Sequence, residues 1–397
     1  MRKFLQTFIC ILLPAISFAQ ETWWVKPDSL FKYVQPMASI QLWSIYTMNE
    51  KERLVANGPL EPVSNRLNFS ARRARLGFKG NPYKNFSYFL MLHYDNLGRD
   101  RFSATRAGVN DGQVGVIDAY MGWKISKKSD KAILTFGYFR PQISRESITG
   151  DLIANSFDKS LAQSYIRQHM VGKSFGRALG LNLGGQKTEG KFGVNYNVGI
   201  FNNNTTGPST ETAGKYWSPL LAGRLALTFG DPEMDKYSIN YNVNFFNKRK
   251  GITVALNGTS QARTDVFKYN HITGIDVLLN YNNLNIDGEW FWLDRNLEGT
   301  KFQAQTGHIR LGYNLIVKRK IFLEPVLMTS VFYGDTGGQF KGEDKEYNAG
   351  INWYLNKNNL KLSLHYVWQD GHGKNGFTDG VSFQKGNYAG LGFLLML

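Results

Sequence analysis

The stretch KFGVNYNVGIF, residues 191–201, alternates between apolar side chains and polar or small ones. Phe192, Val194, Tyr196, Val198 and Ile200 occupy every second position. Because successive side chains of a β-strand point to opposite faces, this alternation predicts a strand with one apolar and one hydrated face. A soluble β-sandwich alternates in the same way, so the connections between strands must separate the two architectures.

The same kind of pattern predicts sixteen strands along the chain, at 37–48, 66–79, 84–95, 113–125, 131–140, 174–187, 190–201, 219–229, 236–246, 271–281, 284–293, 302–317, 321–333, 345–355, 360–369 and 386–397. Short polar turns such as 188–189 and 282–283 alternate with mostly longer loops such as 96–112 and 141–173. This sorting, with an even strand number, is typical of bacterial outer-membrane barrels, whose turns are periplasmic and whose loops are extracellular. We therefore predict an all-β fold, a transmembrane antiparallel up-and-down β-barrel of about 16 strands, wide enough for an aqueous channel.

One segment does not fit this count. Residues 250–257 are consistent either with an additional strand or with part of the loop between the predicted strands 236–246 and 271–281. An additional strand would break the alternation of turns and loops, so the segment is assigned to the loop.

The N-terminus has the pattern of a secretory signal peptide. Arg2 and Lys3 precede a short apolar run, and Ser17 and Ala19 supply the small residues of a cleavage site. We predict a signal peptide at 1–19, a periplasmic segment at 20–36 and a barrel at 37–397, located in the bacterial outer membrane. The only cysteine, Cys10, lies in the leader, so the mature chain has no disulfide and no cysteine metal ligand.

The chain is strongly basic. Its formal charge of +16 falls by the two charges of Arg2 and Lys3 to +14 when the leader is removed. Such a balance favours anionic partners, and because export separates the protein from nucleic acid, the anion must be met outside the cytoplasm.

Basic side chains on the hydrated strand faces are the candidate site. Alternation places several of them on the faces that point into the lumen: Arg73, Arg75, Arg224, Arg310 and Lys361. For Arg73 and Arg75 this requires a β-bulge near Arg72, which reverses the alternation along their strand. Guanidinium groups hold planar oxyanions through paired hydrogen bonds, so this set predicts a path for phosphate-like solutes. Carboxylates also map inward and make the wall mixed: Asp118, Asp276, Asp287, Glu289 and Glu324.

Enzyme and metal motifs give no support for catalysis. Residues 172–176 match the G-x-S-x-G pattern around Ser174, but that motif requires a strand-to-helix turn in an α/β sheet. The six histidines lack a metal-ligand spacing such as H-E-x-x-H. We expect no catalytic residue, no metal and no cofactor, with an outer-membrane hydrolase using Ser174 as a less favoured alternative.

Several blocks together resemble the phosphate-selective porin O and P family: RRARLGFKG at 72–80, GYFRPQISRE at 137–146, GRALG at 176–180 and LAGRL at 221–225. The resemblance implies a sixteen-stranded, usually trimeric barrel that conducts small anions. It implies solute contact for Arg73, Arg75, Arg140 and Arg224, and less clearly for Arg177. The chain departs from the family pattern at 140–144, where Arg-Pro-Gln-Ile-Ser replaces the frequent Lys-x-Pro-Phe-Ser.

The longest loop, 141–173, is the third extracellular one, and in porins a loop at this place can fold into the lumen. It carries Arg145, Lys159, Arg167 and Lys173 against Glu146, Asp151 and Asp158, so it is nearly neutral. We expect it to fold inward, and Arg145 joins the candidate site.

These observations predict an outer-membrane porin for passive diffusion of small solutes, with a preference for phosphate or other oxyanions. The expected partners are small anionic solutes, outer-membrane lipid and two further copies in a homotrimer. A non-conducting barrel that serves a structural or binding role is the alternative.

Overall fold

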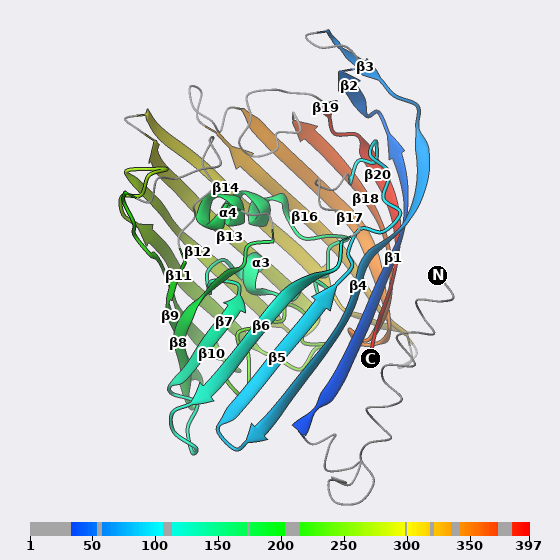
Figure 1. The fold of residues 1–397 in the computed structure, drawn as a ribbon. Helices are drawn as coiled ribbons and strands as arrows, with labels where there is room; N and C mark the ends of the chain where they lie inside the picture. Colours follow the sequence, from blue (N-terminus) through cyan, green and yellow to red (C-terminus); the bar gives the residue numbers. More distant parts are fainter. Residues whose placement is uncertain are drawn as a thin grey trace, which may run out of the picture.

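The computed structural model describes residues 33–53, 58–105, 113–172, 175–202, 215–297, 300–317, 321–334, 342–371 and 383–397. Within these residues the chain forms a closed antiparallel barrel (Figure 1). Its wall consists of β1 (Gln35–Met48), β4 (Arg66–Tyr83), β5 (Phe86–His93), β6 (Gly115–Lys124), β7 (Ile133–Phe139), β8 (Ala178–Glu189), β9 (Phe192–Phe201), β10 (Leu220–Gly230), β11 (Gly251–Gln261), β12 (Tyr269–Tyr281), β13 (Leu284–Leu297), β14 (Thr300–Tyr313), β15 (Leu315–Val317), β16 (Ile321–Tyr333), β17 (Glu343–Asn356), β18 (Leu360–Gly371) and β20 (Asn387–Met396).

The order of the strands in the wall follows the chain, and β1 pairs with β20 to close it. β14 and β15 both pair with β16 and together occupy one strand position, so the described wall has sixteen strand positions. The predicted sixteen-stranded up-and-down barrel is confirmed.

Alternation along the strands separates the outer face from the lumen. In β10, Leu221, Leu225 and Phe229 are exposed on the outer face, whereas Arg224 and Thr228 are buried inside. A membrane barrel needs this arrangement because lipid covers one face and a polar interior the other. The bulge predicted near Arg72 is present: Gln41 of β1 pairs with Arg73 and Leu42 with Ala71, which leaves Arg72 as the additional residue.

One strand was predicted in the wrong place. Residues 236–246 are not a wall strand, and the segment assigned to a loop, 250–257, lies within β11 apart from its first residue. The predicted strand belongs instead to an inserted turn, residues 231–250, which joins β10 to β11 at the periplasmic end. Tyr237, Ile239, Tyr241 and Val243 of this turn are buried, so its alternation reflects packing inside the lumen rather than contact with lipid.

Two further features depart from the prediction. β2 (Lys51–Arg53), β3 (Leu60–Pro62) and β19 (Phe383–Gln384) form a small sheet that extends beyond the extracellular rim (Figure 1). The predicted loop 294–301 is largely strand, because β13 reaches Leu297 and β14 begins at Thr300. The predicted signal peptide and residues 20–32 lie outside the described residues. Among the described residues, no helix has the length and apolar character needed to cross a membrane.

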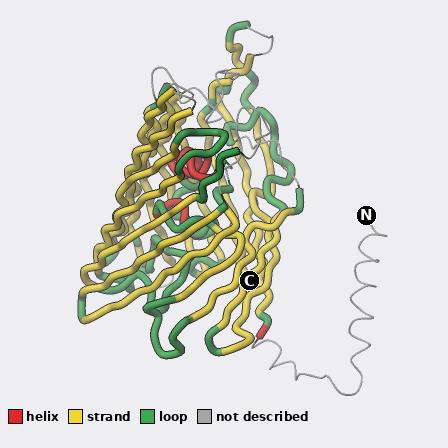
Figure 2. The backbone as a smooth tube through the Cα atoms, turned by 60° about the vertical axis from the view of Figure 1, so that its left-hand side comes forward, coloured by secondary structure: helices red, strands yellow, loops and turns green. Residues whose placement is uncertain are grey.

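The interior of the barrel is occupied. The chain between β7 and β8, residues 140–177 and hereafter the inner loop, carries α3 (Arg145–Ile148) and α4 (Leu161–Val171). Both helices lie within the ring of strands in two views (Figures 1 and 2). The inner loop enters from the extracellular end and the inserted turn from the periplasmic end, so the two segments decide what space remains.

Candidate functional site

The inner loop packs against one side of the barrel through an apolar core. α4 buries Leu161, Ile166 and Met170 in the same cluster as Phe291 and Phe332 of the wall. Tyr165 stacks on the ring of Phe332 with centroids 3.7 Å apart. Burial of large apolar side chains is worth about 1.5–3 kcal/mol each, so this half of the lumen is filled as a folded core rather than left as water.

The tip of the inner loop is fixed to the wall by ion pairs. Ser144 caps α3 by accepting a hydrogen bond from the Ser147 backbone N–H, and the two residues after the cap carry opposite charges. Arg145 contacts Glu233 of the inserted turn at 2.7 Å and Asp276 of β12 at 3.1 Å. The neighbouring Glu146 accepts from Arg310 of β14 at 2.7 Å.

The inserted turn meets the inner loop in the lumen. Gly150 of the inner loop donates a backbone hydrogen bond to the Tyr241 carbonyl at 3.4 Å. The Tyr241 ring lies 5.1 Å from the Arg224 guanidinium, and the Tyr237 hydroxyl donates to Asn197. The two segments therefore form one connected body that links the extracellular and periplasmic ends.

All seven predicted site residues lie buried inside the barrel: Arg73, Arg75, Arg140, Arg145, Arg224, Arg310 and Lys361. Six contact carboxylates, and Lys361 donates to the Ala154 carbonyl of the inner loop at 2.7 Å. Arg73 meets Asp158 at 2.8 Å, and Arg224 meets Asp276 at 2.8 Å. These residues anchor the inner loop and the inserted turn, and the direct solute contact expected of them stays a prediction.

Asp151 of the inner loop is surrounded by cations. Arg140 approaches its carboxylate to 2.6 Å, Arg75 to 3.2 Å, Lys159 to 3.4 Å and Arg167 to 3.9 Å. Burial by itself would raise the pKa of Asp151, but the neighbouring cations, Arg140 first and then Lys159 and Arg75, hold that pKa well below its usual value. The carboxylate is therefore ionised, and it draws four basic side chains to one place.

A cavity of about 440 Å³ remains between the inner loop and the wall near the extracellular end. Basic lining residues outnumber acidic ones, with Arg72, Arg73, Arg75, Arg99, Lys159, Arg167, Arg177 and Lys385 against Asp95, Asp151, Asp158 and Glu346. The arginine strand β4 forms one side of this cavity, and α4 forms the other. The cavity combines an excess of positive charge with hydrogen-bond donors that a solute anion could meet.

Several of these groups were not part of the predicted site. Arg167 lies on α4. Arg177, for which the family resemblance implied solute contact less clearly, pairs with Asp118 at 3.1 Å just before β8 begins. The acidic partners Asp151, Asp158 and Glu233 come from the inner loop and the inserted turn. The available signal was charge complementarity: three acids in an inner loop that faces a wall rich in arginine.

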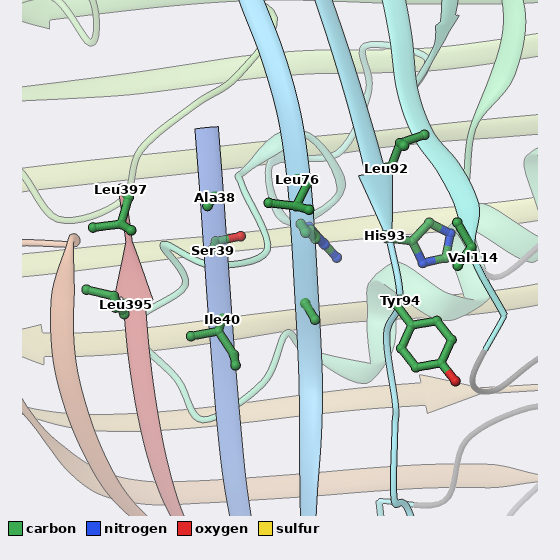
Figure 3. Close-up of a pocket in the computed structure, with 12 residues that line it drawn as sticks. Ala38, Ser39, Ile40, Leu76, Leu92, His93, Tyr94, Val114, Leu395 and Leu397 are labelled. Carbon is green, nitrogen blue, oxygen red and sulfur yellow. The ribbon is translucent and has the colours of Figure 1, made fainter. Parts of the chain in front are cut away.

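A second cavity, of about 410 Å³, lies on the outer face and is apolar. Figure 3 shows Ala38 and Ile40 on β1, Leu76 on β4, and Leu395 on β20 around it. The small side chains Ala38 and Ala74 lie between larger ones, since Ala38 pairs with Leu76 and Ala74 with Ile40. This outer groove faces lipid or protein rather than the lumen.

The sequence matches the family described as phosphate-selective porin O and P over residues 55–396. The chain belongs to that family. The resemblance seen in the arginine strand and the inner loop is thereby confirmed, and the protein is an outer-membrane porin. No curated protein matches the sequence.

Solved porins share the fold of this porin at low sequence identity. OprB of Pseudomonas putida, solved at high pH, is 10% identical with a TM-score of 0.59, covering 93% of this chain and 96% of that chain. The anion-selective porin from Comamonas acidovorans is 10% identical with a TM-score of 0.57, covering 92% and 99%. OmpF of Salmonella typhi, solved with daunomycin, is 13% identical with a TM-score of 0.56, covering 92% and 97%.

The motif that suggested a hydrolase cannot be placed in this porin, because Lys173 and Ser174 lie outside the described residues. The flanking Gly172 ends α4 in a left-handed conformation, with φ of 70°. Gly176 also has positive φ, at 66°. Gly172 and Gly176 therefore allow the chain to leave α4 and turn toward β8.

Proposed function

We propose that this porin is a passive diffusion channel that prefers small anions, including phosphate and other oxyanions. The excess of basic over acidic groups around the 440 Å³ cavity carries the proposal. A positive field at the mouth of a channel raises the local concentration of anions. The family description names phosphate, and the structurally similar Comamonas protein is described as anion-selective. The proposal assigns no catalytic residue and no cofactor.

The inner loop sets the narrowest part of the path in this proposal. The apolar core around α4 closes one side of the lumen, which leaves for solutes the side lined by β4, β17, β18 and β20. Because the wall arginines already have carboxylate partners, an anion would exchange with these partners rather than meet bare cations, and its binding would stay weak enough for release.

Arg72→Gln is the variant that tests anion preference most cleanly. Arg72 pairs with Asp158 at 2.9 Å, but Asp158 keeps Arg73 at 2.8 Å, so removing Arg72 leaves this carboxylate with a cation. We expect the reversal potential in a salt gradient to favour anions in the wild type and to shift toward zero in Arg72→Gln. Arg66→Gln, at a partly exposed pair with Asp100 outside the cavity lining, is the control and should not shift it.

A preference for cations in the wild type would contradict the proposal. The packed core of the lumen favours a second candidate, a non-conducting barrel that serves a structural or binding role. Absence of any conductance from correctly folded protein in planar bilayers would support this second candidate instead.

We further propose a homotrimer whose protomers meet at the outer groove. Small side chains flanked by large ones let neighbouring surfaces approach closely within a membrane, and Ala38 and Ala74 supply such a depression on β1 and β4. Ala74→Trp should fill it and convert trimers to monomers on native gels. Leu256→Trp, on the exposed face of β11 at the other side of the barrel, should leave the trimer intact. Trimers that persist in Ala74→Trp would place the contact elsewhere.

A further inference from the structure

A mixed cluster of carboxylates and one histidine lies where the tip of the inner loop meets the wall. Glu146 comes from α3, Asp287 from β13 and His308 from β14. One potential ligand atom from each lies within 4.8 Å of the others, and all three residues are buried. The His308 Nε2 atom is 3.0 Å from Asp287 Oδ2 and 3.9 Å from Glu146 Oε2.

Several atoms of this cluster have no hydrogen-bond partner among the described residues. They are Glu146 Oε2, Asp287 Oδ1 and His308 Nδ1. The other oxygen of Glu146, Oε1, accepts from Arg310 and from the Ser160 backbone N–H, at 2.7 and 2.6 Å, so the orphaned Oε2 is held in a fixed position. Buried polar atoms without partners are uncommon in native proteins, and a bound ion can supply the missing partner.

The balance of charge also favours a bound cation. Glu289 approaches His308 Nδ1 to 3.7 Å and brings the number of carboxylates around this imidazole to three. Arg310 is the guanidinium that contacts two of them, Glu146 and Asp287. A metal bound to His308 would displace any proton from its ligating nitrogen, and the group of five side chains would then carry two net negative charges, which one divalent cation would neutralise. Uncompensated buried charge is costly, so a dication would stabilise the cluster.

We propose that Glu146, Asp287 and His308 bind one divalent transition-metal ion, of which Zn²⁺ is the best fit. One imidazole nitrogen and two carboxylate oxygens are a common ligand set for Zn²⁺, with bonds of about 2.0–2.2 Å. Two ligands at that distance from one ion are separated by about 3–4 Å, as His308 Nε2 is from Asp287 Oδ2 and from Glu146 Oε2. The metal would replace the present hydrogen bond between His308 Nε2 and Asp287 Oδ2. Small movements of the carboxylates would complete the site.

Hydrogen bonds that would orient the surroundings of this site are already in place. The Ser144 hydroxyl donates to both oxygens of Glu289 at 2.9 Å, and the Glu146 backbone N–H donates to Glu289 at 3.1 Å. Groups that lie behind the metal ligands in this way orient them and tune their basicity. The metal would tie α3 of the inner loop to β13 and β14, so it would hold the inner loop in the lumen independently of the Asp151 cluster.

The test measures Zn²⁺ bound to the mature protein, folded in detergent and stripped with EDTA. After incubation with Zn²⁺ and gel filtration, the wild type should retain one equivalent by mass spectrometry. His308→Asn and Glu146→Gln should retain none. Co²⁺ used alone as a probe should give d–d absorption in the wild type, and this absorption should be lost in both variants.

His365→Asn is the matched control, because His365 is equally buried and inward but hydrogen-bonds to Asn348 and Asn352 rather than to carboxylates. It should retain one equivalent. Correct folding of every variant is checked by the heat-dependent mobility of the barrel on gels. Because Glu146 lies on the inner loop, we expect the wall to form in Glu146→Gln even if His308→Asn fails to fold. A wild type without bound metal, or retention of metal by folded Glu146→Gln, would overturn the proposal.

Discussion

Asp151→Asn should lower the free energy of unfolding by about 3–5 kcal/mol, as expected when one partner of a buried ion pair is removed. Arg140 and Lys159 would then retain backbone carbonyls as partners but lose the carboxylate at 2.6 and 3.4 Å. Four basic side chains would remain close together with less compensation. We expect denaturant unfolding, followed by tryptophan fluorescence in detergent, to show a clearly lower midpoint.

Asp235→Asn is the control for this experiment. Asp235 lies in the inserted turn and is exposed, so its neutral variant should unfold within about 0.5 kcal/mol of the wild type, as surface substitutions usually do. An Asp151→Asn protein as stable as that control would show that the cations around Asp151 do not depend on its charge.

Replacing the inserted turn by a two-residue Asn-Gly turn should raise the single-channel conductance several-fold. Gly230 of β10 pairs directly with Gly251 of β11, so a tight hairpin can close between them without a change of register. The replacement removes Tyr237, Ile239 and Tyr241 from the lumen, and water would fill the space, as a barrel of this width permits. Planar-bilayer recording of single insertions measures the effect.

Loss of the inserted turn also removes Glu233, one of the two carboxylates that hold Arg145. Part of the gain in conductance would therefore come from a more mobile inner loop. Glu233→Gln with the turn intact separates the two effects, since it weakens the ion pair and leaves the volume unchanged. Asn240→Ala, at an exposed position of the same turn, should behave as the wild type. Unchanged conductance after turn replacement would show that solutes do not pass beside this segment.

The wall of the barrel could be predicted from the sequence because lipid and lumen impose a strict two-residue period. Even the bulge at Arg72 could be predicted, since the parity of apolar positions reverses across it. The inserted turn could not, because a segment packed against the interior buries alternate residues as a wall strand does. Ile252, Val254 and Leu256 of β11 also alternate, but their segment was assigned to a loop because an additional strand would have broken the alternation of turns and loops, and that assignment was wrong.

The candidate site was only half predictable. The alternation of side chains along the strands predicts that Arg73, Arg224 and Arg310 point into the lumen, and the structure has them buried there. Alternation carries no information on where a loop folds. Their partners Asp158, Asp276 and Glu146 lie between 52 and 164 residues away along the chain. The same separation hid the His308 cluster, whose members come from three elements with no shared motif.

The contents of the barrel also constrain the order in which the protein can assemble. Glu146 reaches Arg310 across 164 residues, and Lys361 reaches Ala154 across 207. Contacts between such distant segments form slowly, because much of the chain must be ordered before they are made. The final seam joins β1 to β20, the first and last strands of the wall. We therefore expect the inner loop and the inserted turn to be enclosed as the wall curls around them, so that core formation and ring closure become one late, cooperative event in biogenesis.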